Sequence, residues 1–223
     1  MPIFAPNLMI LPPAQRELWL ELGETPAGFA LYGGTAIALR IAHRVSVDFD
    51  FFTIEPFDPR ELVENLSYLR GAEVVQVAPN TLTCRVQRDG PVLVSFFGGL
   101  RLRQVAAHDI AQDTGLRVAS LLDLAGTKVD IVQKRAEAKD YLDLDALLRN
   151  GIDLSMALAA AKIVYGAVFN PLVTLKALAY FGDVPEVSSD VQERLRRAVG
   201  SVDVNALPAL AALRGHPEHG ASR

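Results

Sequence analysis

Two short motifs, a glycine turn and a pair of aspartates, constrain this chain more than any other feature of its sequence. Gly33-Gly34-Thr35 interrupts an apolar run, and Asp48-Phe49-Asp50 follows after twelve intervening residues. Glycine permits φ > 0 and a close approach to a ligand, so such a turn can present backbone N–H groups to phosphate. Two nearby carboxylates can hold a divalent cation against the same phosphates. This spacing points to an enzyme.

The residues around the motifs predict the order strand, turn, helix, strand. The apolar segment Ala36–Ala42 predicts about two helical turns with Thr35 as the N-cap, and a helix N-terminus favours an anion. The segment Val45–Thr53 predicts a second strand, on which Asp48 and Asp50 share one face, roughly 6.6–6.8 Å apart. Because the two carboxylates repel each other, a divalent metal between them would relieve the repulsion.

Each motif also has an ordinary structural explanation. An Asp-x-Asp pair alone is typical of a solvated strand end, and Gly-Gly-Thr alone is typical of a turn. The combination in the right order favours the functional interpretation. A Walker phosphate loop and a dinucleotide-binding fingerprint are both absent from the sequence.

Three segments carry a resemblance to a known family. They are Leu31–Leu39 with Arg44–Phe52, Asp123–Lys128 with Arg135–Leu144, and Phe169–Leu178 with Tyr180–Asp183. The first two resemble motifs of the AbiEii/AbiGii toxin family of nucleotidyltransferases, which belongs to the DNA polymerase β-like superfamily, and the third supports them.

The resemblance implies Mg²⁺-dependent transfer of a nucleoside monophosphate from NTP to an acceptor, with release of pyrophosphate. Family members act as toxins in toxin–antitoxin or phage-defence loci, and some resemble enzymes that extend the tRNA acceptor end. The roles implied are phosphate binding by Gly33, Gly34 and Thr35, metal binding by Asp48 and Asp50, phosphate contact by Lys128, and a catalytic helix carboxylate at Asp140.

A basic stripe is expected beside the second motif. If Leu121–Leu148 is one helix, Arg135 and Lys139 lie seven and eleven positions after Lys128, within about 20° of it. Such a stripe would neutralise triphosphate charge, so Arg135 and Lys139 are candidate nucleotide-binding residues. Lys139 and Asp143 also form an i,i+4 pair. The alternative is a solvated helix face with salt bridges.

One departure from the superfamily is visible. Polymerase β-like enzymes usually present a third carboxylate on a later strand. Here Thr81–Gln87 and Pro91–Phe97 predict a hairpin, and its second strand offers Ser95 where an acid is expected. Either Asp140 takes over as proton acceptor, or the protein is slow or only binds NTP.

Composition favours a globular, cytoplasmic protein. The chain has 223 residues, 50% of them hydrophobic, and charged residues interrupt its longest apolar stretches. The first residues lack a basic leading region, which argues against a signal peptide. The lone Cys84 lies in a strand pattern, as a buried hydrophobic residue would. We expect no membrane partner.

A net charge of −4 is not typical of a general nucleic-acid-binding protein, although local patches such as Arg101 with Arg103 can suffice. From the family resemblance, we expect NTP as substrate, RNA, tRNA or protein as acceptor, and a cognate antitoxin as partner. A small-molecule nucleotidyltransferase of the antibiotic-modifying kind, a degenerate NTP-binding member and a scaffold that keeps only the fold are the alternatives.

The chain as a whole predicts an α+β fold. Residues 1–115 would form a mixed-sheet nucleotidyltransferase core flanked by helices, residues 116–212 a helical C-terminal domain, and residues 213–223 a flexible tail. The expected C-terminal helices are Val118–Asn150, Leu154–Phe169, Pro171–Phe181 and Asp190–Val199. The active site would lie between the two halves.

Overall fold

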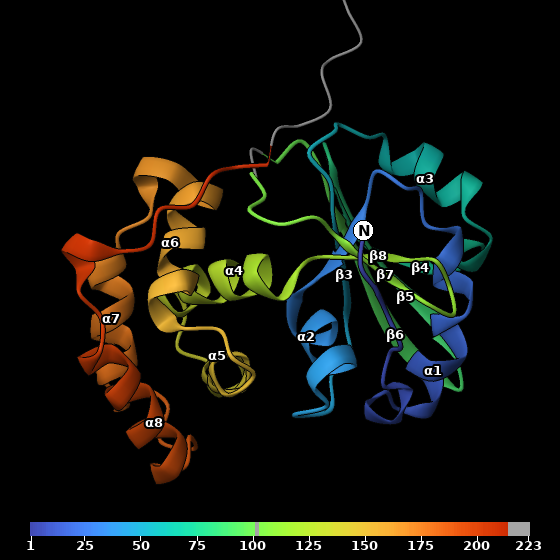
Figure 1. The fold of residues 1–223 in the computed structure, drawn as a ribbon. Coiled ribbons are helices and arrows are strands. Elements are labelled where there is room, and N and C mark those ends of the chain that lie inside the picture. Colours follow the sequence, from blue (N-terminus) through green and yellow to red (C-terminus); the bar gives the residue numbers. More distant parts are fainter. Residues whose placement is uncertain (101–102, 214–223) are drawn as a thin grey trace, which may run out of the picture.

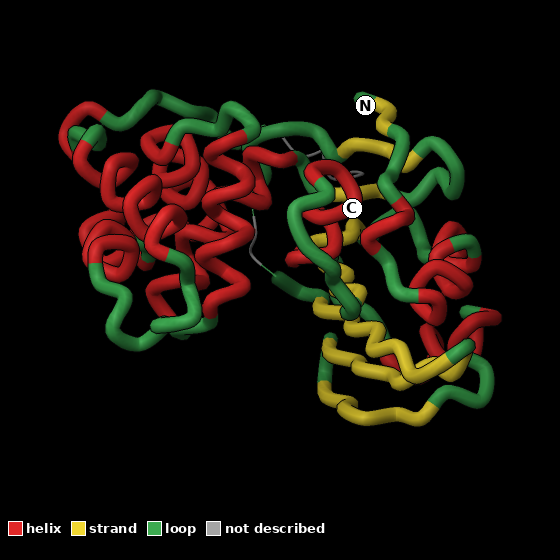
Figure 2. Tube along the Cα trace, turned by 90° about the horizontal axis from the view of Figure 1, so that it is seen from below, coloured by secondary structure: helices red, strands yellow, loops and turns green. Residues whose placement is uncertain are grey.

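A mixed β-sheet and a group of helices lie side by side in this protein, as Figures 1 and 2 show from two directions. The computed structural model describes residues 1–100 and 103–213. The strands are β1 Ile3–Phe4, β2 Ala30–Tyr32, β3 Phe49–Phe52, β4 Glu73–Ala78, β5 Thr81–Arg88, β6 Gly90–Phe97, β7 Asp109–Ala111 and β8 Arg117–Val118. The α-helices are α1 Pro13–Trp19, α2 Gly33–Ile41, α3 Pro59–Asn65, α4 Leu121–Lys134, α5 Ala138–Arg149, α6 Leu154–Tyr165, α7 Pro171–Ala179 and α8 Ser189–Gly200. The predicted α+β class is confirmed.

The sheet has the strand order β1-β7-β8-β2-β3-β6-β5-β4. The pairs β1/β7, β2/β8 and β3/β6 are parallel, and the other pairs are antiparallel. The predicted hairpin is confirmed as β5 and β6, which meet at Asp89, with Gly90 at φ +130°. Its position beside β3 brings Ser95 next to the second aspartate of the motif.

The two faces of the sheet differ in burial. On β3, Phe49 and Phe51 are fully buried, whereas Asp50 between them is half-buried on the opposite face. The buried face packs against α1, where the Trp19 ring lies 6.2 Å from that of Phe49. Cys84 on β5 is also fully buried, as its pattern predicted. The aspartate therefore lies on the half-exposed face.

The predicted strand Val45–Thr53 is wrong in its first half, because only Phe49–Phe52 pair in the sheet. Val45 and Val47 are exposed, so their β-branched side chains are not buried in a sheet. Side-chain bonds hold this segment instead, and they belong to the candidate site. Asp48 consequently lies just before β3.

The predicted continuous helix Leu121–Leu148 is also wrong. Helix α4 ends at Lys134, Arg135 is extended, and α5 starts at Ala138. The two helices pack against each other, and α4 also contacts α6 and α7. A Cβ at Gly126 would lie 3.1 Å from Ala160 Cβ, so the glycine lets α4 and α6 approach closely.

The later helices agree with their predicted positions, with ends that differ by a few residues. The boundary near residue 115 stays a prediction; β8 lies just beyond it, and residues from both halves belong to one hydrophobic core. The tail beyond Leu213 lies outside the described residues. In the part of the chain that the structure describes, no single helix is both long and apolar enough to cross a membrane.

Candidate active site

The start of α2 lies directly against the carboxylate of Asp50. Gly33 has φ +75°, and a Cβ at this position would lie 2.9 Å from Asp50 Oδ2. A side chain would thus be strained by the backbone and would meet the carboxylate as well. Tyr32 supplies no side-chain cap to the helix, so its first N–H groups remain suited to an anion.

Asp48 lies close enough to Asp50 for its charge to affect the ionisation of Asp50. Burial, followed by the charge of Asp48, raises the pKa of Asp50 to about 6, against the opposing effects of Lys128, Arg135 and Lys139. Two carboxylates in this relation favour a cation between them. Oxygen ligands from one or two carboxylates, completed by substrate phosphates and water, suit Mg²⁺.

Thr35 does not cap α2 as predicted, because the helix already begins at Gly33. Its buried hydroxyl donates to the Asp48 carbonyl oxygen at 2.5 Å and shares a hydrogen bond with the Ser46 hydroxyl at 2.7 Å. These bonds hold the segment before β3 in its non-strand conformation. Thr35 therefore positions Asp48 relative to the helix start.

A buried ion pair joins α4 and α5 beside the aspartates. Lys128 Nζ lies 2.7 Å from Asp140 Oδ1 and 2.6 Å from Asp143 Oδ2, and all three side chains are at most 3% exposed. Arg135 Nε donates to Asp140 Oδ2 at 2.8 Å. Buried charges are tolerated when they are paired and hydrogen-bonded in this way.

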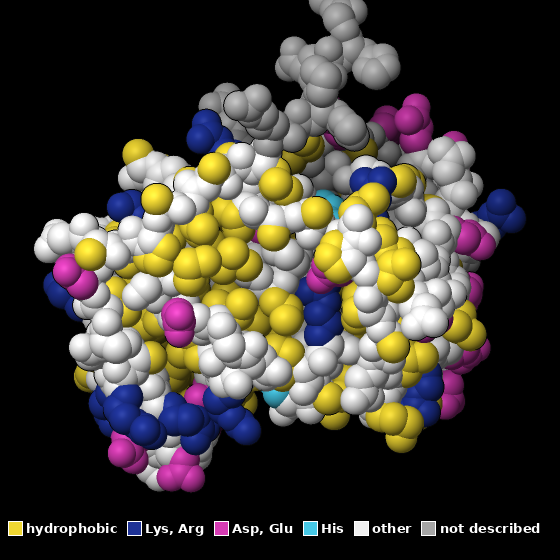
Figure 3. Space-filling model, in the orientation of Figure 1, with side chains coloured by type: hydrophobic (Ala, Val, Ile, Leu, Met, Phe, Trp, Pro, Cys, Tyr) yellow, Lys and Arg dark blue, Asp and Glu magenta, His cyan; other side chains and the backbone are white. Residues whose placement is uncertain are grey.

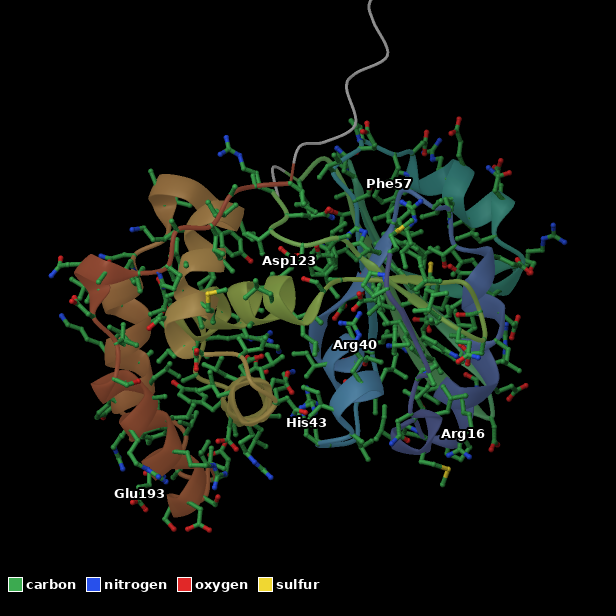
Figure 4. The ribbon with its side chains drawn as sticks, viewed as in Figure 1. Arg16, Arg40, His43, Phe57, Asp123 and Glu193 are labelled. Carbon is green, nitrogen blue, oxygen red and sulfur yellow. The ribbon has the colours of Figure 1, made fainter. Side chains whose placement is uncertain are left out.

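A second set of contacts links this cluster to the end of α2. Arg44 donates to Asp143 Oδ1 at 2.6 Å and to Oδ2 at 2.9 Å, and His43 Nε2 lies 2.7 Å from Oδ1. Figure 4 shows His43 on the side of α2 that faces α5. A Cβ at Gly34 would collide with the Arg44 guanidinium. Asp143 thus joins the sheet half to the helical half.

The basic stripe predicted on one helix does not exist, because the helix ends before Arg135. Lys139 pairs with Glu137 at 2.8 Å, so the expected pair with Asp143 is wrong. Even so, all three predicted cations, Lys128, Arg135 and Lys139, act on Asp50 electrostatically. Packing of α4 against α5, rather than helical periodicity, gathers them.

Asp140 is a poor candidate for a proton acceptor. Burial by itself would raise its pKa, but hydrogen bonds from Arg135 and the charge of Lys128 lower the pKa below the ordinary value. Burial opposes ionisation of Asp143 in the same way, and His43, Arg44 and Lys128 hold its pKa well below the usual range. Both carboxylates therefore stay ionised and hold cations.

Ser95 occupies the position expected for a third carboxylate. It pairs with Asp50 in the parallel register of β3 and β6, and its hydroxyl accepts from Thr83 at 3.2 Å. Among the described residues, no group of three or more His, Cys, Asp or Glu side chains could hold a metal ion. A metal here would depend on Asp48, Asp50 and substrate oxygens.

Other basic residues have structural contacts. The Arg40 side chain is only 6% exposed, lies 2.9 Å from Asp109 Oδ2 and stacks over the Phe4 ring. Figure 3 shows Lys and Arg side chains gathered around the lower end of α8. On this helix, Arg194 pairs with Asp145 at 2.7 Å. Arg101 lies outside the described residues.

Sequence reasoning missed Asp143, Arg44 and His43 as members of the site. The spacing Asp140-x-x-Asp143 places two acids on one helix face, and this was the available signal. The adjacent residues His43 and Arg44, just after α2, gave no indication of a partner about a hundred positions later in the chain.

Comparisons with known proteins agree with this geometry. The sequence profile of the family described as "Nucleotidyl transferase AbiEii toxin, Type IV TA system" matches residues 20–211. An uncharacterized protein of Aquifex aeolicus is 32% identical over 168 residues, which cover 74% of this chain and 79% of that protein.

Two solved structures share the fold. MenT4, a nucleotidyltransferase toxin from Mycobacterium tuberculosis, has a TM-score of 0.57 at 17% identity and covers 86% of this chain and 83% of its own. A candidate nucleotidyltransferase of H. pylori has a TM-score of 0.54 at 16% identity, and the match covers 84% of this chain and 90% of the H. pylori chain. With the profile match, these findings establish that the chain belongs to the AbiEii family of nucleotidyltransferase toxins and is a nucleotidyltransferase.

Proposed function

We propose that this protein transfers a nucleoside monophosphate from a Mg²⁺-bound NTP to a hydroxyl group on RNA, tRNA or protein. The observation that carries the proposal is the contact between Gly33 and the Asp50 carboxylate at the uncapped start of α2. It unites an anion-binding helix end and a metal-binding carboxylate pair at one point. Triphosphate chemistry needs both groups there.

Different residues of the site would bind the phosphates and the Mg²⁺ ion. The N–H groups of Gly33, Gly34 and Thr35 would bind phosphate oxygens, while Asp48 and Asp50 would hold Mg²⁺. A bound Mg²⁺ would neutralise phosphate charge and favour ionisation of Asp50, whose pKa is raised to about 6 by burial and by Asp48.

Three cations balance the remaining negative charge. Lys128, Arg135 and Lys139 already act electrostatically on Asp50. They are therefore close enough to attract a triphosphate that the aspartates hold through Mg²⁺. Lys128 is fixed between two carboxylates, and this pairing keeps the ammonium group in one place. Fixed cations of this kind stabilise charge that develops during phosphoryl transfer.

The reaction is a single displacement at the α-phosphorus. The acceptor oxygen forms a bond to this atom while the bond to the oxygen that bridges the α- and β-phosphates breaks, and pyrophosphate leaves with that electron pair. Because Ser95 is no base and Asp140 is held by two cations, the hydroxyl proton passes to solvent.

The biological setting follows from the family. A type IV toxin–antitoxin system includes a cognate antitoxin, and modification of a tRNA, another RNA or a protein would account for toxicity. We expect the reaction to take place in the cytoplasm, where NTP and these acceptors are present.

The test is incubation of the purified protein with each labelled NTP, Mg²⁺ and a cell extract that contains total RNA and protein. Label that enters one macromolecule class identifies acceptor and base together. The Asp48→Ala/Asp50→Ala double variant should transfer nothing, whereas the Glu61→Ala/Glu64→Ala control on α3 removes two exposed acids and should keep activity. Mg-NTP binding without any transfer would contradict the proposal.

A further inference from the structure

A cavity of about 730 Å³ opens beside the candidate site. Its wall includes Tyr32 and Phe52 from the half-exposed face of the sheet, and Arg103, His108 and Arg117 from the segments that follow β6. This volume falls within the usual range of small-molecule sites. Asp50 does not line the cavity, so the space is additional to the aspartate pair.

The sheet register places the cavity next to the proposed reaction centre. Tyr32 pairs directly with Asp50 across β2 and β3, and Phe52 follows Asp50 by two residues on the same face. Two residues along a strand, such as the step from Asp50 to Phe52, span roughly 6.6–6.8 Å. A molecule in the cavity therefore lies within about one nucleotide's length of the metal-binding carboxylate.

Aromatic side chains line part of the cavity. Tyr32 is only 6% exposed, and its ring packs edge-to-face against that of Phe52 at 5.1 Å and that of His108 at 6.3 Å. Burial, and then the charges of Arg117 and Arg40, lower the pKa of His108 to about 4, so this imidazole is neutral at pH 7. Neutral aromatic rings provide stacking surfaces for a flat base.

The wall also carries positive charge. Within the described residues, neither the Arg103 nor the Arg117 side chain has an ion-pair partner, whereas Glu55 is the one acidic residue among those that line the cavity. Two guanidinium groups beside aromatic rings match a phosphate attached to a base. A purely apolar ligand would leave both cations unused.

We propose that this cavity binds one nucleotide unit, with its base against Tyr32 and Phe52 and its phosphate at Arg103 and Arg117. The inference rests on the proposed function, because it assigns a substrate subsite beside the same aspartates. This chemistry matches the 3′-terminal nucleotide of an RNA acceptor, because the triphosphate of a bound NTP is already assigned to the start of α2 and the aspartates. The nucleoside part of the NTP, which has no further phosphate for the arginines, is the other source that the test distinguishes.

Equilibrium binding to the full chain distinguishes these sources without requiring transfer. The probes are the four Mg-NTPs, measured by calorimetry, and a short single-stranded oligoribonucleotide with a free 3′-hydroxyl, measured by fluorescence anisotropy. The variants are Arg103→Ala/Arg117→Ala and Phe52→Leu. The control Arg60→Ala/Arg70→Ala removes the same charge from two exposed positions that do not line the cavity.

We expect both cavity variants to weaken binding of the same probe, the arginine variant at least tenfold and Phe52→Leu several-fold, with no change in the control. A loss confined to the oligoribonucleotide assigns the acceptor end, and a loss confined to NTP assigns the donor. Unchanged affinity for both probes, or an arginine effect no larger than the control's, would overturn the proposal. An effect of the arginines without one of Phe52→Leu would overturn the stacking part.

These outcomes are separable from failure of the proposed function. If the protein transfers no nucleotide but the cavity variants still lose affinity, the subsite stands and the reaction assignment fails. If transfer occurs and the cavity variants bind normally, the reaction assignment stands and the subsite fails. Thermal unfolding of each variant checks that a loss of affinity does not reflect a loss of folded protein.

Discussion

Replacement of Gly33 by alanine separates backbone strain from displacement of the Asp50 carboxylate. Gly33 has φ +75°, and its added Cβ would lie 2.9 Å from Asp50 Oδ2. Gly71 also has φ +75°, but an added Cβ there meets nothing within 4 Å. Gly71→Ala is therefore a matched control for the left-handed conformation alone.

The two effects have different sizes. The left-handed conformation costs an alanine about 1–2 kcal/mol, so both variants should lose a similar free energy of unfolding. Ordinary van der Waals contact begins near 3.4 Å, so the Asp50 carboxylate must retreat by about 0.5 Å in Gly33→Ala only. Because a 1 Å misplacement can cost about 10²-fold in rate, we expect a roughly tenfold loss of transfer.

Chemical denaturation and initial transfer rates at saturating Mg-NTP test this reasoning. Gly33→Ala and Gly71→Ala should have similar free energies of unfolding, and Gly71→Ala should keep the wild-type rate. Equal rates in the two variants would refute the reasoning, since the contact with Asp50 would then have no consequence for the reaction.

Three further predictions concern the residues around the aspartates. Asp143→Ala should lower the free energy of unfolding by about 3 kcal/mol in denaturant titrations, because it leaves the buried Lys128 charge partly unpaired. The control Asp145→Ala should lower the free energy of unfolding by less, because its partner Arg194 is 34% exposed. Asp50→Asn should raise the Tm of the metal-free protein near pH 7. The raised pKa of Asp50, about 6 against an ordinary 3.8, makes the wild type lose stability as pH rises through this interval, so the gain should vanish below pH 4. A gain that grows towards low pH would contradict this sign. Thr35→Val should reduce transfer more than NTP binding, because it removes the hydroxyl that holds the Asp48 carbonyl; equal losses in rate and binding assays would argue against a positioning role.

The elements whose sequence signals are local were predictable. The hairpin around Asp89 carries its own turn residues, and α2 begins at a glycine pair, so both lie close to where the sequence indicates. The family pattern predicted Ser95 at the place of the third carboxylate, and the register of β3 and β6 sets it opposite Asp50. The hairpin and the helix start depend only on neighbours within a few residues.

The features that sequence reasoning missed depend on contacts between distant residues. Helix α4 stops at Lys134 so that α5 can fold back, and this return brings Asp140 and Asp143 to Lys128. Likewise, the segment before β3 is not a strand because Thr35 and Asp143 hold it through side chains. Periodicity along one helix or strand contains no information about such partners.

The most direct test of the account is a crystal structure of the protein with Mg²⁺ and a non-hydrolysable NTP analogue. We predict a metal ion bound by Asp48 and Asp50, with phosphate oxygens on the N–H groups of Gly33 and Gly34 and beside Lys128. A nucleotide bound elsewhere, or one bound here without a metal ion on the aspartates, would contradict the account.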